Sequence, residues 1–167
     1  MPAYVIDVNV CIVANCGSNQ ADAKCELSCI ELLMKARSEI VCIDAGDHIL
    51  AAYRDHLSLK GQPGPGDEFM YWLYQNQSNT TVCERVPAYV HSERVFEEFP
   101  DDVDLNTFDR ADRIYVAVAL SSGRNPTIVN AVDSDWLHFD NALAKHGIRL
   151  HQLCPQCLKA EKKPGKK

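Results

Sequence analysis

Residues 127–136 read TIVNAVDSDW, a mainly apolar run that ends in two acidic residues separated by a serine. An apolar run without alternation is typical of a strand that is covered on both faces, as in a parallel sheet. Two further runs show the same pattern, YVIDVN at residues 4–9 and IVCID at residues 40–44. We expect all three to contain buried strands, and we expect a short final strand at Ile148–Leu150.

Between these strands, apolar residues recur every three or four positions, which is the period of a helix with one buried face. The spacing and the breaker residues predict helices over the segments 21–37, 49–57, 67–77, 108–120 and 140–145. The apolar residues 10–14 are interpreted as chain that continues from the first strand to a turn, and residues 82–100 show no clear pattern. Strands that alternate with helices define the α/β class. We therefore predict a three-layer α/β/α sandwich with a mostly parallel central sheet.

The length of 167 residues, of which 46% are hydrophobic, suits one domain with one core. We place this domain at residues 1–153. A short Cys-Pro-Gln-Cys segment and a basic tail, expected to be flexible, occupy residues 154–167. No apolar stretch approaches the roughly 18 residues of a membrane span, and the first residues lack the pattern of a signal peptide. These features predict a cytoplasmic protein without a membrane segment.

The formal net charge is −6, from 17 basic and 23 acidic residues. Such a surface repels a polyanion on average, so any nucleic-acid site has to be local.

The eight cysteines fall into two groups. Six lie singly or at helical spacing in or beside apolar segments, and we expect them to be reduced thiols that pack as small core residues. These six are Cys11, Cys16, Cys25, Cys29, Cys42 and Cys83. Cys154 and Cys157 have the two-residue gap of a metal knuckle or a redox pair. Tetrahedral zinc needs four ligands, of which His151 could supply a third, and no fourth is evident, so a plain turn is the alternative interpretation.

Acidic residues follow the predicted strands at their carboxyl ends. Asp7, Asp44 and Asp133 each end a strand, and the ligand crevice of an open parallel sheet lies at these ends, so we expect them to converge. Asp109 and Asp112 share one face at the start of the next predicted helix, although helix capping is an alternative explanation, above all for Asp109. Clustered carboxylates repel one another unless a cation neutralises them, and hard oxygen ligands suit Mg²⁺ or Mn²⁺. The pattern indicates a divalent-metal site.

Three blocks of the sequence together resemble the signature blocks of the PIN-domain ribonucleases. They are VIDVN at residues 5–9, FDRADRIYVAVA at residues 108–119 and VNAVDSDW at residues 129–136. The resemblance extends from Tyr4 to about Leu153. It implies a PIN-like fold and an endonuclease that depends on Mg²⁺ or Mn²⁺ and hydrolyses phosphodiester bonds, most often in single-stranded RNA.

The resemblance also implies roles for individual residues. Asp7 matches the acid of the first strand, and Asn9 matches the polar residue two positions later. Asp112 matches the helix acid, and Asp133 matches the acid after the later strand. Asp7, Asp112 and Asp133 are thus the expected metal ligands and catalytic acids, together with Asp135 as an auxiliary carboxylate that orients the attacking water.

One position departs from the family pattern. The family places a further acid, usually glutamate, on the helix after the second strand, and this chain has Ala52 where that acid is expected. Either Asp44, Asp47 or Asp55 compensates, or the alanine inactivates the site. The alternative function is therefore a catalytically impaired PIN scaffold that binds RNA or a protein partner.

Basic and aromatic residues near the expected crevice are candidates for RNA contact. Arg54, Arg110 and Arg113 are the candidate phosphate-binding residues, and Trp136, directly after the acidic pair, is the candidate for base stacking. Solvated surface positions explain the arginines equally well. Stand-alone PIN proteins of this size resemble the toxic halves of toxin–antitoxin pairs, which implies an antitoxin partner and a homodimer as further expectations.

Overall fold

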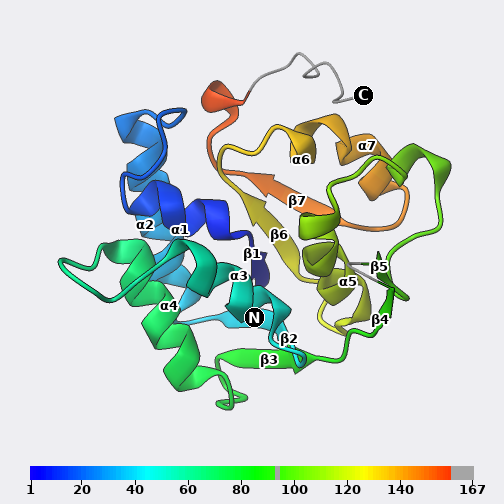
Figure 1. Ribbon diagram of the computed structural model, residues 1–167, viewed down its shortest axis with the longest axis horizontal. Coiled ribbons are helices and arrows are strands. Elements are labelled where there is room, and N and C mark those ends of the chain that lie inside the picture. The colour runs from blue at the N-terminus through cyan, green and yellow to red at the C-terminus, as the bar shows by residue number, and fades with distance from the viewer. Residues whose placement is uncertain (93–94, 159–167) are drawn as a thin grey trace.

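A five-stranded parallel sheet runs through the centre of the computed structural model, which describes residues 1–92 and 95–158 (Figure 1). Its strands are β1 (Ala3–Ile6), β2 (Ile40–Asp44), β3 (Cys83–Val86), β6 (Thr127–Asn130) and β7 (Arg149–Gln152). The spatial order is β3-β2-β1-β6-β7, and every neighbouring pair is parallel. The predicted α/β class with a parallel central sheet is confirmed.

Strand β1 lies at the middle of the sheet and pairs on both sides. Ala3 is opposite Ile40 of β2, and Tyr4 is opposite Thr127 of β6. The chain builds outward from β1 to β3 and later returns to place β6 on the other side of β1. The strand order therefore reverses between β1 and β6, and such a reversal opens a crevice at the carboxyl ends of the two strands.

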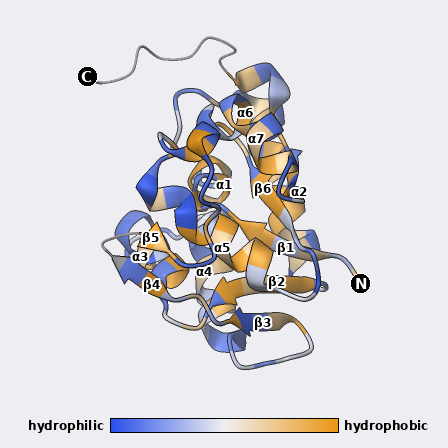
Figure 2. Cartoon of the chain, turned by 90° about the vertical axis from the view of Figure 1, so that its right-hand side faces the viewer, coloured by the Kyte–Doolittle hydropathy of each residue, from blue (hydrophilic) through white to orange (hydrophobic). Residues whose placement is uncertain are grey.

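Helices cover both faces of the sheet (Figure 1). On one side α1 (Val8–Ala14), α2 (Ala23–Ala36) and α4 (Pro65–Asn76) pack against one another, and on the other side α5 (Arg113–Ser121) contacts β1, β2 and β6. Helix α3 (His48–His56) contacts β2, α1 and α5. Figure 2 shows the hydrophobic residues concentrated in the strands and in α5. Burial of this apolar surface is the main source of stability.

Helix α1 corrects the sequence prediction, which continued the first strand through residues 10–14. The helix begins directly after Asp7, whose side chain accepts a hydrogen bond from the amide of Asn9 and so caps it. Five of its seven residues are buried, so the segment has no polar face. Periodicity does not distinguish a short helix that is buried all round from a buried strand, which is why the prediction failed here.

The helices predicted over 21–37, 49–57 and 67–77 are confirmed as α2, α3 and α4. Helix α4 begins at Pro65, two residues before the expected start at Asp67. Pro65 occupies the first helical position, where the amide that proline lacks is not needed. The carboxylate of Asp67 instead accepts the amide hydrogen of Gly64 at 2.8 Å and thereby fixes the chain at the helix start.

The part of the chain without a clear pattern, residues 82–100, holds β3 and an antiparallel pair of short strands. The predicted helix 108–120 begins with a separate 3₁₀ turn, and the predicted helix 140–145 is preceded by another short helix. The remaining elements are β4 (Val90–Ser92), β5 (Val95–Phe96), η1 (Val103–Leu105), η2 (Arg110–Asp112), α6 (Asp135–His138), α7 (Asp140–Ala144) and η3 (Pro155–Cys157). Strands of two to four residues are too short for a reliable period.

A disulfide joins Cys25 of α2 to Cys154, so the expectation of a reduced thiol at Cys25 is wrong. The two residues are 129 positions apart, and spacing alone does not reveal which cysteines meet over such a distance. Cys154 is fully buried, and the Cys-Pro-Gln-Cys segment is therefore packed against the domain. The free cysteines of the described part are Cys11, Cys16, Cys29, Cys42, Cys83 and Cys157.

Two expectations concern the membrane and the tail. Within residues 1–92 and 95–158, none of the helices has both the length and the apolar character that a bilayer crossing requires. The basic tail, which we predicted to be flexible, lies at residues 159–167, outside the described residues.

The approach of α4 to α1 depends on Gly66. A Cβ atom on Gly66 would lie 2.1 Å from the carbonyl oxygen of Cys11, and a backbone atom of a packed helix has little room to move. Overpacking of this kind costs about 1–3 kcal/mol, so Gly66→Ala should lower the melting temperature by roughly 2–12 °C. Gly123→Ala is the matched control, because nothing lies within 4 Å of its new Cβ. Equal melting temperatures for the two variants by circular dichroism would contradict the close approach.

Candidate metal centre

Three acidic side chains meet at the carboxyl ends of β1 and β6. One ligand oxygen each from Asp7, Asp112 and Asp133 lies within 4.8 Å of the other two. Asp7 follows β1, Asp133 follows β6, and Asp112 ends the 3₁₀ turn before α5. The structure thus brings together the three acids that sequence reasoning selected, at the place where the strand order reverses.

Asp7 is held rigidly, since it is only 3% exposed and both of its oxygens accept hydrogen bonds. Oδ1 accepts the amide of Asn9 at 2.9 Å, and Oδ2 accepts the indole Nε1–H of Trp136 at 2.8 Å. Trp136 itself is fully buried against the rings of Phe108 and Tyr115. Our expectation that Trp136 stacks on bases is therefore not met, because the indole instead orients the buried carboxylate.

The electrostatics of this cluster favour an added positive charge. Burial raises the pKa of Asp7, and the charge of Asp133 raises it further, although the hydrogen bonds from Asn9 and Trp136 act in the opposite direction. Burial also raises the pKa of Asp112 well above the usual range of an aspartate, and the charges of Asp7, Asp133 and Asp109 add to this effect. Without a cation, the ionised forms of Asp7 and Asp112 are disfavoured.

Asp112 also belongs to a second group of acids. One oxygen each from Asp109, Asp112 and Asp135 lies within 4.8 Å of the other two. Asp109 is exposed and accepts the amide of Ala111 at 2.9 Å, so the capping interpretation is confirmed for this residue. Asp112 caps nothing with its side chain. Asp112 thus belongs to both groups and links Asp7 and Asp133 to Asp109 and Asp135.

An asparagine pair holds the loop that carries Asp133. The Asn9 Oδ1 accepts the amides of Ala131 and Val132 at 2.9 and 3.3 Å, and its Nδ2 donates to Asn130 Oδ1 at 3.0 Å. Asn130 is fully buried, and its Oδ1 also accepts the amide of Asp133 at 3.1 Å. The Asn9 side chain therefore positions Asp133 by holding the loop that carries it. Sequence reasoning missed Asn130, although an asparagine at the end of a buried strand is a signal for such a role.

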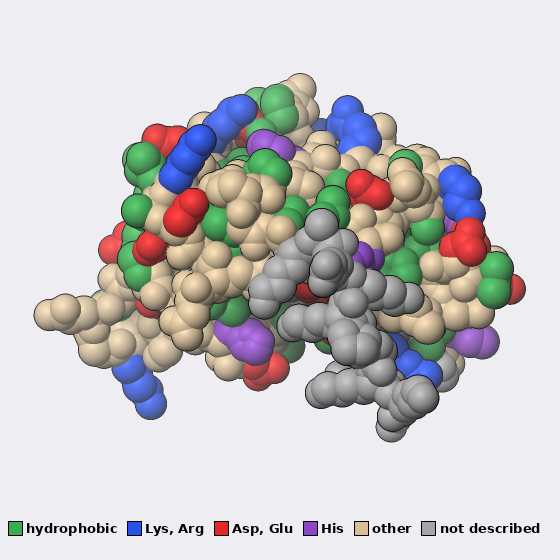
Figure 3. Space-filling model, turned by 90° about the horizontal axis from the view of Figure 1, so that it is seen from above, with side chains coloured by type: hydrophobic (Ala, Val, Ile, Leu, Met, Phe, Trp, Pro, Cys, Tyr) green, Lys and Arg blue, Asp and Glu red, His purple; other side chains and the backbone are tan. Residues whose placement is uncertain are grey.

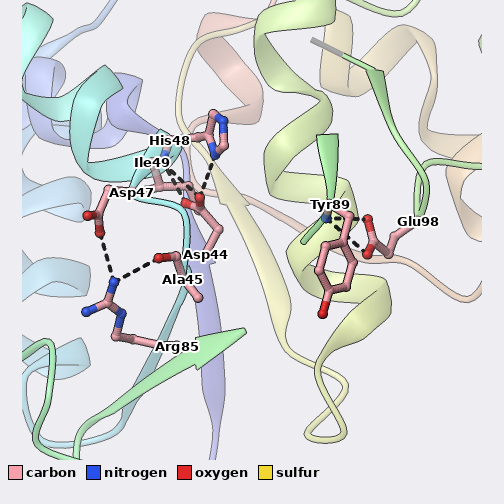
Figure 4. A network of polar contacts seen from close by, with 8 residues as sticks. All are labelled: Asp44, Ala45, Asp47, His48, Ile49, Arg85, Tyr89 and Glu98. Carbon is pink, nitrogen blue, oxygen red and sulfur yellow. Dashed lines mark hydrogen bonds and ion pairs between the residues drawn. The ribbon is translucent and has the colours of Figure 1, made fainter. Parts of the chain in front are cut away.

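Asp44, expected to converge with Asp7 and Asp133, has a different role. Its carboxylate accepts the amides of His48 and Ile49 and lies 2.8 Å from the His48 ring nitrogen Nδ1, and so it caps α3 (Figure 4). Figure 4 also shows Asp47 paired with Arg85. These two acids are engaged at α3 and do not replace the carboxylate that the family pattern places at position 52.

Ala52 lies in a cavity of about 410 Å³ between α3 and the start of α5. Arg110 and Ala111, the two residues before Asp112, line the same cavity, as does Asp55 one helical turn beyond Ala52. Of the three acids considered as substitutes for the missing one, Asp55 is thus the one that faces this space. It is exposed and stands on the same face of α3 as Ala52.

The candidate RNA-binding residues have different surroundings. Arg110 is exposed beside the cavity. Arg113 is partly buried, with its guanidinium 4.5 Å from the Phe99 ring centroid, and it donates to the carbonyl of Phe108, so it holds the loop before α5. Arg54 is directed toward the ring of Tyr74 on α4, 5.9 Å from its centroid. Arg110 is therefore the candidate that is exposed and also lines the cavity.

Figure 3 shows one face of the molecule, seen from above relative to Figure 1. Among its coloured side chains, lysine and arginine lie in separate places around the rim and form no continuous basic patch. This agrees with the acidic net charge of the chain. A polyanion would therefore have to be bound through a few local contacts.

No family model, curated protein or solved structure matches this chain.

Neutralising Asp112 should stabilise the metal-free protein. Because burial and the neighbouring acids raise its pKa in the folded state, the folded state binds a proton more readily than the unfolded chain does. Stability therefore falls as the pH rises above the unfolded value of about 4. Asp112→Asn removes this loss, and we expect its melting temperature in EDTA at pH 7 to exceed that of the native chain by about 2–4 °C, or roughly 1 kcal/mol.

The gain should shrink as the pH approaches 4, where Asp112 is protonated in the unfolded chain as well as in the folded protein. Asp101→Asn, at an exposed position outside both acid groups, is the control and should change nothing. Mn²⁺ should raise the melting temperature of the native chain more than that of Asp112→Asn. A lower melting temperature of Asp112→Asn in EDTA would contradict the electrostatic interpretation.

Removing the Asn9 side chain should loosen the loop that carries Asp133. Asn9→Ala leaves the amides of Ala131 and Val132 without their acceptor, and each unsatisfied amide costs about 1–3 kcal/mol. We expect the melting temperature to fall by at least 4 °C, whereas Asn141→Ala, at an exposed position on α7, should change it by less than about 1 °C. Thermal unfolding in EDTA measures both, and an unchanged Asn9→Ala variant would refute the role of this side chain.

Proposed function

We propose that this protein is a PIN-like, metal-dependent endonuclease that hydrolyses phosphodiester bonds, with single-stranded RNA as the favoured substrate. The observation that carries the proposal is the meeting of Asp7, Asp112 and Asp133 within 4.8 Å at the carboxyl ends of β1 and β6. Each of these acids comes from a different one of the three sequence blocks that resemble the PIN-domain ribonucleases. Blocks that lie far apart in the chain thus supply one site.

The donor set fits Mg²⁺ or Mn²⁺. The ligand atoms are carboxylate oxygens, which these hard cations prefer, and the raised pKa values of Asp7 and Asp112 indicate a site that lacks positive charge. Asp7, Asp112 and Asp133 would hold the ion. When bound, such an ion supplies the charge that polarises a phosphate and activates water for attack on phosphorus.

The side chains around the three acids have different roles in the proposed reaction. The hydrogen bonds from Asn9 and Trp136 keep Asp7 in one orientation, so the site is organised before a ligand arrives. Asp135, which lies near Asp112 in the second group of acids, takes the auxiliary role of orienting the attacking water. Arg110 lies beside the cavity and is the residue that we assign to the substrate phosphate.

A second candidate function is a binding scaffold for RNA or a protein partner with impaired catalysis. The observation that favours it is Ala52, which contributes no ligand atom to the cavity next to the acids. Loss of one acid from a metal site weakens metal binding and slows the reaction without unfolding the domain. The two candidates therefore differ in activity and share one fold.

A carboxylate restored at position 52 should increase cleavage. We expect Ala52→Glu to cleave labelled single-stranded RNA with Mn²⁺ at least about tenfold faster than the native chain, which corresponds to roughly 1.4 kcal/mol in the barrier. Ala52→Gln has nearly the same size without the charge and should show no gain. EDTA should abolish the activity, and Asp112→Asn added to Ala52→Glu should reduce it to background. Asp112 is preferable to Asp7 here, because both oxygens of Asp7 accept structural hydrogen bonds.

The outcomes separate the two candidates. Cleavage by the native chain that falls in Asp55→Ala identifies Asp55 as the substitute acid. RNA binding without cleavage in the native chain and in Ala52→Glu would favour the scaffold. Cleavage that persists in EDTA or in Asp112→Asn would overturn the assignment of the acids.

A further inference from the structure

A second group of metal-ligating side chains, which shares no residue with the acids, lies between α2 and the last described segment. Cys25 and Cys29 are spaced four residues apart, so they lie on the same face of α2, and both are fully buried. The sulfur atoms of Cys25, Cys29 and Cys154 all lie within 4.8 Å of one another. A disulfide accounts for Cys25 and Cys154 and leaves the Cys29 thiol directly beside it.

Cys157 is a fourth cysteine, in the turn that directly follows Cys154. It ends the turn η3, and its amide donates a hydrogen bond to the carbonyl of Cys154 at 2.9 Å, as in a tight Cys-x-x-Cys turn. The amide of Cys25 donates to the carboxylate of Asp22 at 2.7 Å and is the main cause of the lowered pKa of Asp22, to which a hydrogen bond from the Cys157 side chain adds. Burial raises the pKa of the Cys29 thiol to about 12. Cys157 is half-buried and lines a cavity of about 780 Å³, so solvent reaches it.

We propose that Cys25, Cys29, Cys154 and Cys157 bind one Zn²⁺ ion in the reduced protein. Zinc bonds to thiolates of about 2.3 Å in a tetrahedron place the sulfur atoms roughly 3.8 Å apart. Three of these sulfurs already lie within 4.8 Å of one another, and reduction of the Cys25–Cys154 bond lets that pair separate to this spacing. Cys157, whose sulfur is outside that 4.8 Å group, completes the set by a rotation of its side chain away from Asp22. His151, the third ligand considered from the sequence, is exposed on β7 and lies outside the cluster.

Zinc binding requires that the Cys25–Cys154 bond first be reduced. A phosphine breaks this S–S bond by a two-electron transfer: phosphorus takes up the oxygen of one water molecule as a phosphine oxide, and the two protons of that water convert the sulfurs to thiols. The four thiols then release four protons to the solvent as Zn²⁺ binds to the four sulfurs. The disulfide and the metal thus connect α2 to η3 in alternative ways.

The sulfur site is chemically distinct from the acid site. Soft thiolates select zinc, whereas carboxylates suit magnesium and manganese. The inference consequently does not depend on nuclease activity, and the Asp112→Asn variant should keep its zinc site.

The test uses the full chain reduced with a phosphine in metal-free buffer and then titrated with Co²⁺ and Zn²⁺. We expect one equivalent of Co²⁺ to produce the intense thiolate-to-metal absorption of a tetrahedral sulfur site, and one equivalent of Zn²⁺ to abolish it. Elemental analysis after gel filtration should find one zinc per chain. Cys29→Ser and Cys157→Ser should each weaken zinc binding at least tenfold, whereas Cys16→Ser, at an exposed position, should not.

Several experimental results would overturn the proposed zinc site. A reduced native chain that takes up no zinc would overturn it, as would zinc that Cys29→Ser and Cys157→Ser both bind as tightly as the native chain does. Cys157→Ser changes a half-buried position, so its folding is expected to be intact, and circular dichroism checks this. Cobalt spectra that lack the thiolate absorption but change in Asp112→Asn would place the ion at the acids instead.

Discussion

The hydrogen bond from the indole of Trp136 to the carboxylate of Asp7 joins positions 129 residues apart and connects the core to the site. Asp7 also caps α1, so one buried carboxylate fixes the end of β1, the start of α1 and the beginning of α6. A charged group at this depth is costly unless it receives hydrogen bonds. Two buried tyrosines also hold the residues on either side of Asp7. Tyr53 donates to the carbonyl of Ile6 at 2.7 Å, and the Tyr115 hydroxyl accepts the amide of Val8.

This arrangement has an electrostatic cost. Asp112 adds a carboxyl group beside one that burial already disfavours as an anion, and Asp133 adds a third. Side chains that are arranged to bind a ligand often destabilise the ligand-free fold, and binding of the ligand then stabilises the folded state. The cysteine cluster follows different chemistry, since sulfur ligands and oxygen ligands select different cations.

Sequence reasoning predicted those features that depend on local pattern. The continuous apolar runs predicted β1, β2 and β6, and the parallel order then placed Asp7 and Asp133 at neighbouring strand ends. It failed where the direction of a side chain decides the outcome. Asp44 ends a buried strand just as Asp7 does, yet it turns to the amides of α3, and Trp136 turns inward instead of toward solvent. Helix α1 and the short strands after residue 82 have too little periodicity to be recognised, and the pairing of Cys25 with Cys154 depends on contacts that spacing does not encode.

The pairing of β6 with β1 also has a consequence for how the protein is made. Synthesis proceeds from the N-terminus, so β1 leaves the ribosome long before its neighbour on one side exists. Until Thr127–Asn130 has emerged, the crevice has one wall, and Asp7 has neither Trp136 to orient it nor Asp133 opposite it. Until residues 127–136 have been synthesised, the nascent chain therefore carries Asp7 without the partners that complete the group of acids.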